Sequence, residues 1–167
     1  MLTLLIIVAF AVPQEPAPTR MPALPDVADR ARWFGTWTQD FEASSSRPGA
    51  NPYRRVTLTI APRTGSTEGI EVRYDMVGTR GGRTHMEWRG AFDGADYPVQ
   101  GVDYVLTNAY FRISETAYRI VVKVDGVEVA RTEVAISEDA STMTGVTTEA
   151  GPQRPATTTA VYRRAPD

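Results

Sequence analysis

Apolar and polar residues alternate one by one through most of the chain beyond Gly35, and no other feature constrains the fold as much. Residues 55–60 show the pattern clearly, because valine, leucine and isoleucine alternate there with arginine and threonine. Successive side chains of a strand point to opposite faces of a sheet, so a period of two indicates strands with one buried and one solvated face. The sequence therefore predicts an all-β protein.

Turn signals divide the alternating stretches into short strands. Only Asp125 and Gly126 separate residues 118–124 from residues 127–136, and this pair is typical of a two-residue type I′ hairpin. We count eight to ten strands, spaced about ten residues apart, with no helical pattern between them. Such a succession predicts an antiparallel up-and-down meander. We expect it to close into a barrel, because closure removes exposed strand edges, and a two-layer sandwich is the alternative.

The N-terminal part of the chain has a different composition. Residues 1–11 are almost wholly apolar and contain the pattern Ala9-Phe10-Ala11, which predicts a signal peptide and hence an exported, periplasmic or secreted protein. No Lys or Arg precedes this run, so a retained apolar N-terminus is the alternative. The run is too short to span a bilayer, and we expect no stable membrane insertion after cleavage.

Residues 12–25 contain five prolines, which favour an extended linker. Asp26 can cap a short helix that ends at Trp33, because Val27, Ala31 and Phe34 follow helical spacing. The predicted barrel domain comprises residues 26–167, including this N-terminal helix. Its length suits one core and one domain.

Composition excludes several classes of function. The formal net charge is −2, which gives no electrostatic basis for binding nucleic acid or an anionic membrane surface. The chain has no cysteine and one histidine, so it offers no disulfide, no thiolate and few metal ligands. We expect no cofactor and no metal site.

The stretch Trp33-Phe34-Gly35-Thr36-Trp37, a short lead-in followed by G-x-W at the start of the first strand, resembles the lipocalin and wider calycin pattern. The resemblance implies a barrel whose Trp37 lies at the closed end. It also implies that an arginine near the end of the last strand, Arg163 or Arg164, packs across this tryptophan. These roles of Gly35, Trp37 and the arginine are structural.

Residues 33–163 also resemble a group of small exported bacterial proteins of lipocalin-like type without an assigned activity. The matching features are the G-x-W motif, residues 56–60, residues 92–101 and the Asp125-Gly126 hairpin. This likeness implies a fold and no catalytic residues.

Two polar pairs are candidates for chemistry. His85 and Glu87 lie two apart on one strand face, a spacing that suits two ligands or an acid/base pair, but solvated side chains on a polar face are the favoured interpretation. Asp93 and Asp96 form a close carboxylate pair, yet their Asp-Gly-x-Asp setting favours turn chemistry over catalysis or weak calcium binding. We therefore expect no catalytic residues and no enzyme.

Two functions remain. In the first, the barrel carries or senses a small hydrophobic or amphipathic ligand, since such sites are concave and mostly apolar. A core filled by its own side chains is the plain alternative for a small barrel. In the second, the protein is an interaction or inhibitor-like module of the cell envelope that uses its loops. The candidate ligand-binding residues are Trp37, Tyr74, Trp88, Tyr110, Phe111 and Tyr118.

Overall fold

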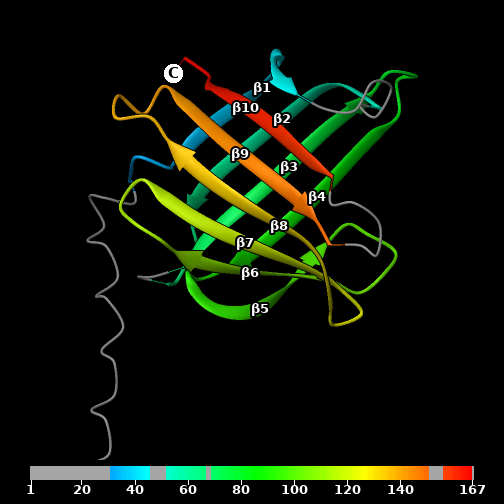
Figure 1. The fold of residues 1–167 in the computed structure, drawn as a ribbon, viewed down its shortest axis with the longest axis vertical. Helices are drawn as coiled ribbons and strands as arrows, with labels where there is room; N and C mark the ends of the chain where they lie inside the picture. Colours follow the sequence, from blue (N-terminus) through cyan, green and yellow to red (C-terminus); the bar gives the residue numbers. More distant parts are fainter. Residues whose placement is uncertain (1–30, 46–51, 67–68, 151–155, 167) are drawn as a thin grey trace, which may run out of the picture.

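The computed structural model describes residues 31–45, 52–66, 69–150 and 156–166. These residues form ten antiparallel strands in a closed barrel, which confirms the predicted all-β meander and excludes a sandwich (Figure 1). The strands are β1 (Gly35–Ser45), β2 (Tyr53–Pro62), β3 (Ile70–Gly78), β4 (Arg83–Gly90), β5 (Asp93–Gln100), β6 (Leu106–Arg112), β7 (Ala117–Val124), β8 (Val127–Ile136), β9 (Thr142–Glu149) and β10 (Thr157–Arg164).

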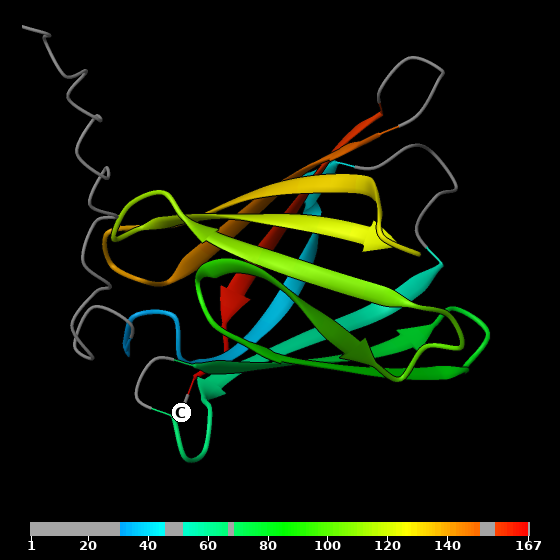
Figure 2. The same ribbon diagram turned by 90° about the horizontal axis from the view of Figure 1, so that it is seen from below.

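The first strand closes the barrel. β1 pairs with β2 through Trp37 and Leu58, and with β10 through Trp37 and Arg164, while every other strand pairs with its neighbours in sequence. The strands consequently wrap around one interior (Figure 2). No strand of this sheet is left at an edge, which removes the row of unpaired backbone groups that an edge presents.

The β7–β8 turn has the geometry that its sequence predicts. Asp125 and Gly126 have φ angles of 50° and 79°, and a type I′ turn requires positive φ at both central residues. The predicted turn at Asp93 and Gly94 is different, because β5 already begins at Asp93. Gly94 has a φ of 76° and lies where the β5–β6 register shifts, so this Asp-Gly pair forms an irregularity within a strand pair.

The signal peptide of residues 1–11, the linker of residues 12–25 and most of the helix predicted for residues 26–33 lie outside the described residues. In the described part of this lead-in, Ala31 is helical, residues 32–33 form a turn, and Phe34 N donates to Ala31 O at 3.2 Å.

Arg164, and not Arg163, packs across Trp37. Its guanidinium lies 4.3 Å from the Trp37 ring centroid, and it donates hydrogen bonds to the carbonyl oxygens of Phe34 at 2.5 Å, Ala140 at 2.7 Å and Arg32. Trp37 is fully buried, and its Nε1 donates to Trp33 O at 3.1 Å. These contacts tie the lead-in, the β8–β9 connection and the last strand together at one end of the barrel, called here the Trp37 end.

Gly35 is required at the Trp37 end for two reasons. Its φ of 130° lies in a region that side chains rarely adopt, and an added Cβ would stand 2.8 Å from Arg164 Nη1. Arg163 instead points outward, where it pairs with Asp40 at 3.1 Å. The G-x-W motif and the final arginine therefore act together as a structural unit.

Candidate functional site: the interior cavity

Aromatic side chains fill the part of the interior next to β4, β5 and β6. Trp88 and Tyr110 stack with ring centroids 3.9 Å apart, and Tyr110 stacks in turn on Tyr118 at 5.4 Å. Tyr97 meets Trp88 edge-on at 5.9 Å. The interior has unfilled space beside this stack.

A cavity of about 180 Å³ occupies that space. Strands β2, β3 and β6 to β10 line it, whereas β4 and β5 contribute no lining residue because their aromatic side chains belong to the stack. The apolar lining residues are Leu58, Ile120, Val122, Val134, Met143 and Ala160, the others being Tyr74, Asn108, Tyr118, Thr132, Gly145, Thr147 and Tyr162. A cavity of about 150 Å³ with apolar walls is large enough to bind benzene, so this one can hold a ring-sized molecule.

The size of the cavity depends on small residues in β9 and β10. Gly145 faces it, and a Cβ added there would meet only Thr132 Cγ2, at an ordinary contact distance of 3.4 Å. Ala160 is the cross-strand partner of Gly145. A larger side chain at either position would project into the space.

Polar groups in the lining carry no formal charge. Thr132 and Thr147 satisfy each other through a hydroxyl–hydroxyl hydrogen bond of 2.8 Å. Asn108 Oδ1 and the Tyr110 hydroxyl, by contrast, are buried without a hydrogen-bond partner within the described residues. The Tyr110 hydroxyl lies close enough to that of Tyr74 for their interaction to raise the pKa of Tyr110 and to lower that of Tyr74.

The electrostatics of the interior oppose negative charge. Burial raises the pKa of four inward-facing tyrosines, and neighbouring phenols raise it further for all but Tyr74, so the phenols stay protonated at neutral pH. Neither a basic nor an acidic side chain lines the cavity. The four tyrosines are Tyr74, Tyr110, Tyr118 and Tyr162.

The six candidate ligand-binding residues lie in three different places. Tyr74 and Tyr118 line the cavity. Trp37, Trp88 and Tyr110 are at most 1% exposed and belong to the packed core beside it. The prediction that Phe111 faces the interior is wrong.

Phe111 lies on the outer face of β6. It is 40% exposed, and its ring lies against Gly94, whose added Cβ would be 2.5 Å from it. The inward positions of β6 are those of Asn108 and Tyr110, one residue out of phase with Phe111. Because β6 carries apolar residues in both phases, its pattern does not determine which set is buried.

The sequence did not identify most of the polar lining. Asn108, Thr132 and Thr147 are polar residues at inward positions, and a period-two pattern assigns such positions to the solvent face. Tyr162, which precedes the two arginines, also lines the cavity and is not among the predicted residues. The signal for it is its phase, since Tyr162 lies two residues before Arg164 and so on the same face of β10.

His85 lies outside the barrel and away from the cavity. Its side chain is 52% exposed, with Nδ1 2.8 Å from Asp75 Oδ1 and Nε2 3.2 Å from Glu87 Oε1. The hydrogen bond with Asp75, followed by that with Glu87, raises the pKa of His85. Among the described residues, no group of three or more His, Cys, Asp or Glu side chains is arranged to hold a metal ion.

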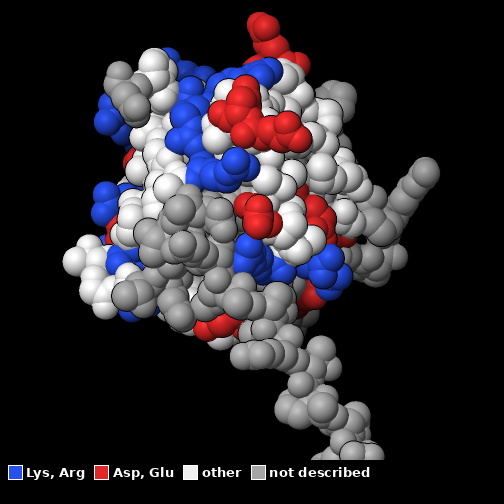
Figure 3. Space-filling model, turned by 90° about the vertical axis from the view of Figure 1, so that its left-hand side faces the viewer, with Lys and Arg blue, Asp and Glu red and all other residues white. Residues whose placement is uncertain are grey.

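These contacts are part of a mixed network of charges on the outer face of β3 and β4. Arg89 pairs with Glu87 at 2.9 Å and with Glu71 at 3.3 Å. Basic and acidic side chains also lie side by side on the face of the barrel shown in Figure 3. The exposed pairs of this kind contribute little to stability individually.

Asp93 and Asp96 do not act as a pair. Asp93 accepts hydrogen bonds from the Ala95 N–H at 2.9 Å and from the Tyr97 hydroxyl at 2.7 Å, whereas Asp96 pairs with Lys123 at 2.8 Å. Burial raises the pKa of Asp93, but these two hydrogen bonds outweigh it and lower the pKa overall. The local backbone chemistry that the sequence predicts is therefore found at Asp93, whereas Asp96 forms a salt bridge with a distant residue.

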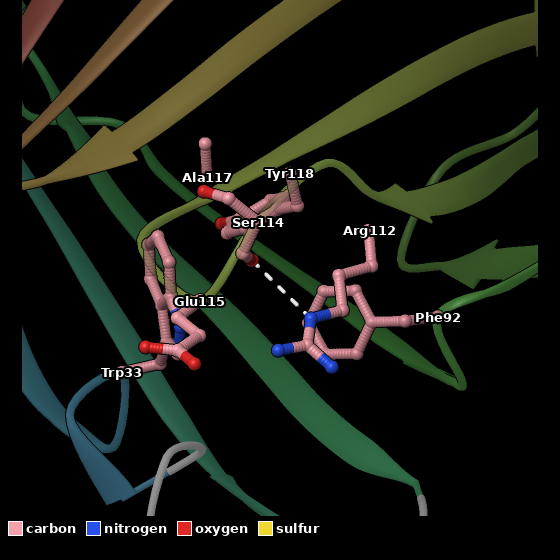
Figure 4. Close-up of a pocket in the computed structure, with 7 residues that line it drawn as sticks. All are labelled: Trp33, Phe92, Arg112, Ser114, Glu115, Ala117 and Tyr118. Atoms are coloured by element: carbon pink, nitrogen blue, oxygen red, sulfur yellow. Dashed lines mark hydrogen bonds between the residues drawn. The ribbon is translucent and has the colours of Figure 1, made fainter. Parts of the chain in front are cut away.

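A notch beside the Trp37 end is too small for a ligand. Its volume is about 20 Å³, which is about the space of one water molecule. Arg112 lies across it and donates from Nε to Ser114 O at 3.3 Å (Figure 4). The residues around it are Trp33, Phe92, Arg112, Ser114, Glu115, Ala117 and Tyr118.

In the described part of the chain, no helix is both long and apolar enough to cross a bilayer. Comparison of the sequence with protein-family models and with curated proteins gave no match. The ten-stranded closed meander is consistent with a lipocalin-like fold.

Proposed function

We propose that this protein binds one small, largely apolar molecule inside its barrel and acts as a carrier or sensor. The observation that carries the proposal is the cavity of about 180 Å³, which seven strands line and in which nine of the thirteen lining residues are aliphatic or aromatic. Transfer of apolar surface from water into such a space is favourable at about 25 cal/mol per Å². The proposal is one of binding without catalysis.

The framework around the cavity favours a preformed site. The walls are strands of a closed sheet, and the neighbouring aromatic stack fixes Tyr118 through its contacts with Tyr110 and Trp33. A site that needs little reorganisation loses less free energy on binding. The cavity therefore supports affinity for a molecule of only one or two rings.

A cavity-filling variant tests the proposal. Gly145→Ile places a β-branched side chain in the cavity, whereas Val146→Ile, the control, changes the next residue, which is 37% exposed on the outer face. We expect toluene, detected by saturation-transfer NMR, to bind the wild type and Val146→Ile but not Gly145→Ile. Equal binding to both variants, or no binding to the wild type, contradicts the proposal.

A second candidate function is that of a protein-interaction module. Tyr104, Val105 and Val127 are 55%, 63% and 66% exposed at the end of the barrel opposite the Trp37 end. Asp125 N donates to Val105 O at 3.0 Å, which holds the β5–β6 loop beside the β7–β8 turn. This candidate would be favoured if the wild type captures a protein from envelope extract and the double variant Val105→Ser, Val127→Ser does not.

We further propose that the protein is exported, as the apolar residues 1–11 indicate. The mature chain would then lack this segment. Intact-mass measurement of protein from the native host checks this, and a mass that still includes Met1 contradicts it.

A further inference from the structure

One acceptor in the cavity wall has no hydrogen-bond partner among the described residues, and it belongs to β6. Asn108 and Tyr110 are alternate residues of β6, so both side chains face inward, about 7 Å apart along the strand. Asn108 lines the cavity, and its Oδ1 is buried without a hydrogen-bond partner among the described residues. The Asn108 backbone oxygen, in contrast, accepts a hydrogen bond from Trp88 Nε1 at 3.2 Å.

A buried acceptor without a donor is costly, because it has lost its hydrogen bonds to water and gained none. The other polar lining side chains near β8 and β9 do not share this condition, since Thr132 and Thr147 bond to each other. A molecule that places an N–H or O–H group against Asn108 Oδ1 gains a hydrogen bond that the protein itself does not supply.

The remaining walls restrict the rest of such a molecule. Leu58, Ile120 and Met143 offer only apolar contact, and Tyr74 and Tyr118 offer ring surfaces. No cationic side chain is present to neutralise an anion, and the shifted phenols show that burial in this interior already disfavours negative charge.

From these observations we infer that the cavity selects a neutral, ring-sized molecule with one hydrogen-bond donor, and that Asn108 Oδ1 accepts the hydrogen bond from this donor. The inference rests on the proposed function and adds to it the chemical class of the ligand. It excludes fatty acids and other carboxylates, which need a cation for their charged end.

Three bicyclic probes of nearly equal size test the inference. Indole carries an N–H donor, benzofuran carries an acceptor in its place, and indene carries neither. Isothermal titration calorimetry measures the three affinities, and we expect indole to bind about tenfold more tightly than indene and benzofuran. A tenfold difference in affinity corresponds to about 1.4 kcal/mol, as expected for one additional hydrogen bond. Indole-2-carboxylate at pH 7 should bind more than tenfold more weakly than indole.

Two variants assign the selectivity to one residue. Asn108→Leu should bind indole and indene equally, with the affinity for indene retained as proof that the cavity is intact. Thr107→Val is the matched control, because it removes a hydroxyl from the neighbouring residue of β6, which does not line the cavity, and it should keep the tenfold preference. If Asn108→Leu does not fold, Asn108→Ala serves the same purpose, and the order of the probes on the wild type needs no variant.

The outcomes separate the two proposals. Equal affinities of the wild type for indole, indene and benzofuran would overturn the inference and leave the cavity as a general apolar site. Tightest binding of benzofuran would overturn the assignment of Asn108 as an acceptor. Binding of none of the three probes would contradict the proposed function, and this inference with it.

Discussion

Replacement of Arg164 by methionine tests whether the Trp37 end holds the barrel closed. Methionine keeps an unbranched stem over Trp37 but removes the hydrogen bonds to the carbonyl oxygens of Arg32, Phe34 and Ala140. Three hydrogen bonds at about 1 kcal/mol each, with about 0.5–1 kcal/mol for the cation–π contact, predict a loss of about 4 kcal/mol. That is a large part of the stability of an ordinary domain, which is about 5–15 kcal/mol.

The adjacent residue provides the control. Arg163→Met removes the pair with Asp40 and a hydrogen bond to Thr142 Oγ1 at 2.9 Å from a side chain that is 57% exposed, which predicts a loss of about 1–1.5 kcal/mol. Urea unfolding followed by tryptophan fluorescence measures both variants, and we expect a much lower midpoint for Arg164→Met with an unchanged slope. Equal losses for the two variants, or a larger loss for Arg163→Met, would refute the reasoning.

Two further predictions concern a turn and a titration. Gly126→Ala should lower the free energy of unfolding in urea by about 1–2 kcal/mol, because Gly126 has a φ of 79°. The control is Gly82→Ala, which lies in open space at an ordinary φ and should lower it less. Equal losses for the two variants contradict the turn assignment. Hydrogen bonds raise the pKa of His85 in the folded state. Protonated His85 therefore contributes its full stabilisation below about pH 6.5, the pKa of histidine in the unfolded chain, and this stabilisation is lost as the pH rises through the pKa of the folded state. His85→Gln, which removes the only histidine, should abolish this decline above about pH 6.5, and a decline that persists would assign it to other groups.

The architecture was predictable because one periodic signal repeats along the chain. Strands such as β2 present valine, leucine and isoleucine at every second position, and a shift by one residue would expose all of them. The prediction that Trp37 faces the interior is also correct, because the G-x-W motif fixes which face of β1 this residue occupies. The choice between Arg163 and Arg164 also depends on phase, because Arg164 pairs directly with Trp37 while Arg163 pairs with Thr38.

The site was less predictable because packing, and not periodicity, creates it. Phe111 and Tyr110 are neighbours of similar size, and only the three-dimensional register shows that Tyr110 is the buried one. The cavity arises where Gly145 and Ala160 leave room, and its polar lining contradicts the simple pattern of apolar inside and polar outside. The segment from Asp93 combines glycine and proline, which favour turns, yet the barrel includes it as a strand.

The central claim is that a small neutral molecule occupies the interior. Native mass spectrometry of protein purified gently from its own host, compared with the denatured chain, tests this most directly. The account predicts a single added mass on the order of 100–200 Da, as suits a cavity slightly larger than one that binds benzene, and its absence from Gly145→Ile. No added mass on the wild type, or the same added mass on Gly145→Ile, would contradict the account and favour a function on the outer surface and loops.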